Sequence, residues 1–164
     1  MPPNQILIGL ALFLTFFLMG PIFTRINDEA LQPYFAGEVT QEEVVVLAME
    51  PLREFMIYQV SLEHVGLFAG MANETFAEIE DVPLRVLIPA FILGELTRGF
   101  IFGFLIFMPF LIMDMVVASV LMAMGMMMLP PAMISTPFKI VLFVLVDGWS
   151  LIMELIVGSF RFTN

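Results

Sequence analysis

Long apolar runs alternate with a single acidic segment along this chain of 164 residues. Residues 6–23 form the first run, and a helix of that length just crosses about 30 Å of hydrocarbon. A second run covers residues 99–129 and contains Asp114 as its only charge. A third run follows Pro137 and continues to about residue 160. This pattern predicts an all-α, multi-span membrane protein with a small acidic helical domain.

Capping residues and prolines predict where helices begin within the acidic segment. Thr40 and Glu43 have the spacing of a capping box, which satisfies two orphan N–H groups at a helix start. We expect this helix to end near Glu50, with Pro51 opening a second helix at its first turn. Residues 66–80 are predicted to form a loop.

Prolines also divide the C-terminal half. Pro83 is expected to open a helix that reaches about Thr97, and the pair at residues 130–131 must interrupt the long apolar run. Thr136 and Pro137 are predicted to be the N-cap and first position of the last helix. The two apolar helices then form an antiparallel hairpin. The predicted division is an apolar helix at 1–23, an acidic helical domain at 24–82 on the outer side, and apolar helices at 83–164 that form the hairpin.

The charge is confined to one part of the chain. The net charge of −10 lies entirely within residues 24–84. Basic residues mark cytoplasmic loops, so a base-poor domain is expected on the outer side of the membrane. The negative charge argues against nucleic acid as a partner. The chain has no cysteine, one histidine and no recognisable catalytic motif, so we expect neither an enzyme nor a cofactor or metal site.

Three acidic residues fall inside the apolar helices, namely Asp114, Asp147 and Glu154. An acid at the centre of a membrane helix costs about 2.5–3.5 kcal/mol on the insertion scale, and such residues usually face a bundle interior or water. They are either polar sites along a conduction path or acids neutralised by Lys139 or by backbone partners.

Methionine is concentrated in the same region. Nine of the fifteen methionines lie between Met108 and Met133, and Met126, Met127 and Met128 come just before the proline pair. Unbranched, polarizable side chains repack around irregular shapes. They are suited to seal a pore that admits varied polypeptides, and equally to fill a core or to face lipid.

Several stretches together carry a family resemblance. Residues 109–131 read PFLIMDMVVASVLMAMGMMMLPP, and residues 143–149 read FVLVDGW. With PPNQILIGL at residues 2–10 and PLRVLIPAF at residues 83–91, they resemble the FliP family of flagellar export proteins over nearly the whole chain. Members usually carry a signal sequence and another apolar segment before PPNQ, so we expect this chain to be shortened at its start.

The resemblance implies a subunit of the flagellar type III secretion export gate in the bacterial inner membrane, within the flagellar basal body. It implies about five copies around a central pore, together with FliQ, FliR, other export apparatus proteins and membrane lipids. Exported unfolded flagellar proteins would pass through. The resemblance assigns the pore gasket to Met126, Met127 and Met128, and it implies that the apolar helices are largely buried against other subunits.

Three alternatives stay open. A gate subunit of a virulence secretion system is the nearest, because such gates are close relatives of the flagellar one. An intramembrane aspartyl protease would use Asp114 and Asp147 as a carboxylate pair that shares a proton. A small ion channel would line a cation path with acids.

Overall fold

The computed structural model describes residues 3–126 and 128–161, and every regular element within them is helical. The all-α fold predicted from the sequence is thus confirmed. The elements, in chain order, are α1 (Asn4–Ile26), the π-helix η1 (Asn27–Leu31), α2 (Gln32–Phe35), α3 (Gln41–Gln59), α4 (Leu62–Ala72), the 3-10 helix η2 (Ile79–Asp81), α5 (Leu84–Ala123), α6 (Pro131–Leu145) and α7 (Gly148–Ser159).

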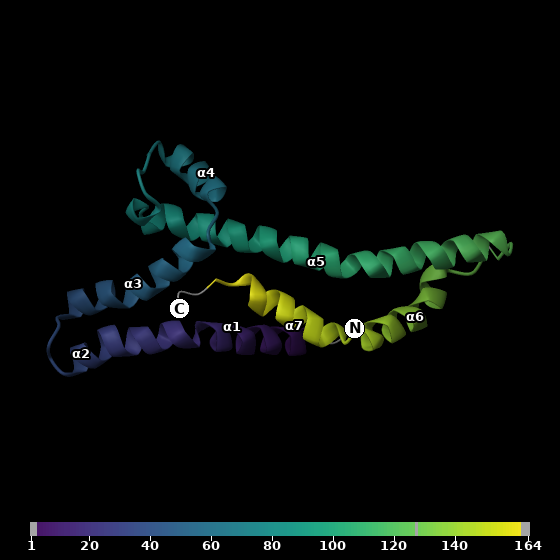
Figure 1. Cartoon of the computed structure of the whole chain (residues 1–164), viewed down its shortest axis with the longest axis horizontal. Coiled ribbons are helices and arrows are strands. Elements are labelled where there is room, and N and C mark those ends of the chain that lie inside the picture. The colour runs from purple at the N-terminus through teal and green to yellow at the C-terminus, as the bar shows by residue number, and fades with distance from the viewer. Residues whose placement is uncertain (1–2, 127, 162–164) are drawn as a thin grey trace. The chain divides into compact units, whose positions relative to one another are not determined.

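These elements belong to two compact units. The first unit comprises Met1–Gly94 and Phe160–Asn164, and the second comprises Glu95–Ser159. In the first unit, α3 turns back along α1 after the short α2, as Figure 1 shows. In the second unit, α6 folds back from the end of α5, and α7 follows it at an angle of 61°.

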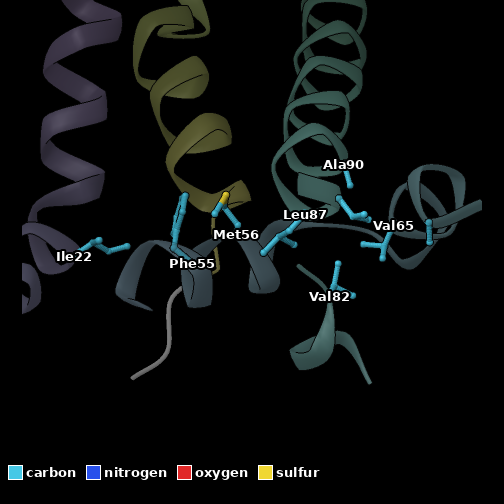
Figure 2. Packing of buried hydrophobic residues seen from close by; sticks show 9 residues of the cluster. Ile22, Phe55, Met56, Val65, Val82, Leu87 and Ala90 are labelled. Atoms are coloured by element: carbon cyan, nitrogen blue, oxygen red, sulfur yellow. The ribbon is translucent and has the colours of Figure 1, made fainter. Parts of the chain in front are cut away.

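A small apolar core holds the first unit together. Ile22 of α1, Phe55 and Met56 of α3, Val65 of α4 and Leu87 of α5 are buried in one cluster (Figure 2). Burying each such side chain contributes about 1.5–3 kcal/mol. Arg25 adds ion pairs to Glu54 at 2.5 Å and to Glu29 at 3.0 Å, but these side chains are more than a third exposed and contribute little.

In the acidic segment, the predicted helix start is confirmed, but the predicted helix end before Pro51 is wrong. The capping box is confirmed: Thr40 Oγ accepts from the Glu43 N–H and the Glu43 carboxylate accepts from the Thr40 N–H. However, α3 continues through Pro51 instead of restarting there. Pro51 is buried on the same face as Phe55, so packing outweighs the hydrogen bond that the proline removes.

The predicted loop is largely helical in its first half. α4 ends at Ala72, and Ser61 caps its start by accepting from the His64 N–H. Asn73 then adopts a left-handed φ of 55°, which ends the helix. Arg53 donates to the carbonyls of Glu80 and Val82, and so ties the remaining loop to α3.

The last helix also differs from its prediction. α6 begins at Pro131, whose missing N–H is harmless at a first helical position. Thr136 therefore lies inside α6, and its hydroxyl donates to the carbonyl of Ala132 instead of capping. The helix is then broken before Gly148 instead of running to residue 160.

Within the described residues, two helical segments, Asn4–Phe35 and Leu84–Ala123, are long and apolar enough to cross a membrane, and α6 with α7 counts as a third if the bent pair is one span. Large apolar side chains on these segments remain exposed, among them Phe13, Phe100 and Leu145. A chain that leaves so much apolar surface uncovered requires lipid or other subunits around it.

Candidate functional site

The methionine-rich turn begins with a well-defined helix end. Gly125 has a φ of 74°, its N–H donates to the Met122 carbonyl at 3.0 Å, and the Met126 N–H donates to the Leu121 carbonyl at 2.9 Å. This is a Schellman motif, which stops α5 and reverses the chain. The start of the turn is therefore fixed by backbone hydrogen bonds.

Two of the three predicted gasket residues can be placed. Met126 is 46% exposed and Met128 is 98% exposed, whereas Met127 lies outside the described residues. Met128 has almost no contact within its own chain. An apolar side chain presented this fully at the tip of a helical turn is available for contact with something outside the chain.

A charged cluster joins the two helices that flank the turn. Asp114 of α5 accepts from Lys139 Nζ at 2.6 Å and from Ser135 Oγ at 2.5 Å, both on α6. Ser135 is fully buried. This arrangement agrees with the interpretation that Lys139 neutralises Asp114. It pairs the carboxylate with an ammonium and a hydroxyl, whereas an aspartyl protease needs a second carboxylate there.

The other two acids occupy different surroundings. Asp147 adopts a left-handed φ of 48° at the break between α6 and α7, and its carbonyl accepts from the Leu151 N–H at 3.1 Å. Gly148 beside it is buried against the ring of Phe143, where a Cβ atom would collide. Asp147 thus forms a helix break, and Glu154 is exposed on α7. Among the described residues, no group of three or more potential metal ligands occurs.

One contact was missed by the sequence reasoning. Gln59, at the end of α3, is only 4% exposed and exchanges two hydrogen bonds with the backbone of Arg161, at 2.5 Å and 3.1 Å. Phe160 stacks on Phe55 with ring centroids 6.2 Å apart. A lone glutamine gives no sequence signal for such a pairing, because its partner is backbone.

The sequence matches that of known proteins over most of its length. The sequence profile of the FliP family matches residues 1–156. The flagellar biosynthetic protein FliP of Bacillus subtilis (strain 168) is 55% identical over 161 residues, which cover 98% of this chain and 73% of that protein. The protein of the same name from Pectobacterium carotovorum is 52% identical, over 97% of this chain and 62% of its own length.

A more distant relative gives the same result. The flagellar biosynthetic protein FliP of Aquifex aeolicus is 45% identical over 98% of this chain and 68% of its own length. The chain spans between 42% and 73% of the length of such relatives. The match covers the methionine-rich turn, the Asp114 and Lys139 pair and the helix break at Asp147. The chain is therefore a member of the FliP family.

Proposed function

We propose that this chain is a subunit of the flagellar type III export gate, where its methionine turn closes a protein-conducting pore. Met128 carries the proposal, because its side chain is almost completely exposed at the tip of an apolar hairpin in a member of this family. Around a closed ring of subunits, such tips converge on the axis. Flexible thioether side chains seal that axis and repack around a passing polypeptide.

The remaining parts of the assembly follow from the family. About five copies of the chain would surround the pore, joined by FliQ, FliR and other export apparatus proteins. The exposed apolar helices would face these subunits and membrane lipids in the inner membrane, within the flagellar basal body. Unfolded flagellar proteins would be the cargo. The whole assembly uses no cofactor in this proposal.

A cysteine experiment tests the gasket directly. The sequence contains no cysteine, so Met128→Cys gives this chain a single thiol. Neighbouring turns that meet at the axis bring two thiols within disulfide distance, about 4 Å between Cβ atoms. Mild oxidation of the assembled complex should then give covalent dimers. Met71→Cys on α4, an exposed methionine outside the second unit, is the control and should stay monomeric.

A leak measurement complements the cross-link. Truncating Met126, Met127 and Met128 to alanine removes the seal, so cells should become permeable to ions while the complex still assembles. Met71→Ala should leave permeability unchanged. A Met128→Cys thiol that never cross-links in an intact complex, with truncation causing no leak, would contradict the gasket.

The flagellar system is favoured over a virulence secretion gate by a specific observation. The relatives described above all carry the name flagellar biosynthetic protein. Deleting the gene should abolish flagellar filaments, and plasmid-borne wild-type protein should restore them. A strain that loses secretion of other proteins while it keeps its filaments would favour the virulence system.

A further inference from the structure

The first turns of α3 expose apolar side chains that the first unit does not cover. Val45 and Val46 are 60% and 68% exposed. With Val39 and Leu47, Val46 lines a shallow hollow of about 370 Å³ that is bordered by Glu42 and Glu43. Valine is a poor choice for a solvated helix position, because its branched side chain loses rotamer freedom there without gaining burial.

Within this surface, Val46 lies away from the face of α3 that packs inside the first unit. Pro51 and Phe55 are buried on the inward face, where α3 packs against α1 and η1. At 100° per residue, Val46 lies about half a turn around the helix from Phe55. Val46 is therefore not an extension of the existing core, whereas Val45 and Leu47 lie about 80° to either side of Phe55 and border the packed face.

The surroundings of the hollow carry charge of one sign. Residues 26–52 contain six acidic residues and no lysine or arginine. The basic residues at either end are already engaged: Arg25 pairs with Glu29 and Glu54, and Arg53 donates to two backbone carbonyls. Hydrogen bonds from the Thr40 N–H and hydroxyl lower the pKa of Glu43, which keeps it charged.

We propose that this surface, formed by Val39, Val45, Val46 and Leu47 with Glu42 at its rim, docks a segment of another protein that combines apolar side chains with lysines or arginines. Apolar groups fill the hollow, and the basic groups meet the uncompensated acids. A second copy that met this surface with the same face would bring the same acids to the contact, and four of its six basic residues already pair with acids of their own chain. An anionic bilayer would be repelled. The proposal goes beyond the gate function and does not depend on the pore.

Site-specific photo-cross-linking in cells tests the proposal with the full-length protein. A benzophenone amino acid replaces Val46, and the adducts formed under illumination are identified by mass spectrometry. We expect an adduct with another protein, in a peptide that contains lysine or arginine beside apolar residues. A benzophenone at Phe13 on α1, which is also highly exposed, reports on a different apolar surface of the chain.

Charge variants then test the complementarity. Glu38→Lys combined with Glu42→Lys reverses one charge at the rim and one beside Val39 in the sequence, and leaves the Thr40 and Glu43 capping box intact. The Val46 adduct should fall at least about fivefold, since like charges then face each other. Glu63→Lys on α4 is the matched control and should leave the yield of the Val46 adduct unchanged. The yield of the Phe13 adduct should be the same in the doubly reversed variant and in Glu63→Lys.

The outcomes separate the possible occupants. Adducts with only a second copy of the chain, only lipid, or a protein segment without basic residues would overturn the proposal. The proposal would also be overturned if the yield of the Val46 adduct did not change on charge reversal, or if no Val46 adduct formed while Phe13 still cross-linked. Reversing the basic residues of the identified partner should restore the adduct of the doubly reversed variant.

Discussion

Lys139 Nζ lies 2.6 Å from Asp114 Oδ2, which joins α6 to α5 across the hairpin. Both side chains are only partly exposed, at 25% and 33%. An unpaired charge at such a position in an apolar helix is costly, whereas an ion pair with additional hydrogen bonds offsets much of that cost. Together with Ser135, this pair explains how an aspartate is accommodated within the long apolar run.

The first prediction concerns that pair. Lys139→Met or Asp114→Asn alone should lower the melting temperature of the purified full-length protein, because each leaves its partner without a counter-charge. The double variant should recover about half or more of the loss, since no charge then remains unpaired. Differential scanning fluorimetry in one detergent provides the comparison, with Lys139→Arg as the charge-preserving control. Losses that simply add in the double variant would show that the two residues act independently.

The outline of this fold could be predicted from the sequence because apolar runs of this length have few alternatives. The capping box at Thr40 was placed correctly because it depends on two nearby residues. The sequence predicts that the last helix starts at Pro137, because Thr136 and Pro137 resemble a helix cap. In the structure α6 starts at Pro131 instead. Local signals compete there, and sequence alone does not rank them.

The candidate site was predictable to different degrees. Methionine density and proline spacing located the turn, but the Schellman bonds that fix Met126 required three-dimensional geometry. Lys139 was named among the possible partners of Asp114, whereas the role of Ser135 was not foreseen. The sequence places Asp147 inside a helix, whereas the structure gives it a left-handed backbone next to Gly148, which packs against Phe143, and no spacing rule reveals this arrangement.

The second prediction concerns the docking of Arg161 on α3. Gln59→Leu removes both hydrogen bonds to the Arg161 backbone, and an unsatisfied buried group costs about 1–3 kcal/mol. Trypsin should therefore cleave the bond after Arg161 at least about fivefold faster in the variant. Cleavage after Arg85 in the same protein is the internal standard. Equal acceleration at both sites would indicate general destabilisation of the first unit instead of local release.

The third prediction concerns pH at the start of α3. Hydrogen bonds from the Thr40 N–H and then from its hydroxyl lower the pKa of Glu43 in the folded protein. A lowered folded-state pKa means that the stabilisation is present above the ordinary glutamate value, and it is lost as pH falls through the lowered one. Hydrogen-exchange protection of the Val44 amide, corrected for intrinsic rates, should decrease over that range.

Substitution of the same glutamate provides the control. Glu43→Gln keeps a capping side chain without a titratable group, so protection should become independent of pH over the same interval. Thr40→Ala should lower protection at every pH, by about 1 kcal/mol of local stability. A pH dependence that persists in Glu43→Gln would assign the effect to another acid of the segment.

The fourth prediction concerns Gly125, which sets the direction of the methionine turn. Its φ of 74° suits glycine, and a Cβ atom there would meet nothing within 4 Å, so Gly125→Ala tests the backbone alone. The alanine should cost about 1 kcal/mol or more, and asparagine should cost less because it tolerates the left-handed region. If the turn seals a pore, Gly125→Ala should raise ion leak through the assembled complex and Gly125→Asn should raise it less. Equal leak from both variants would show that the left-handed turn does not position the methionines that close the pore.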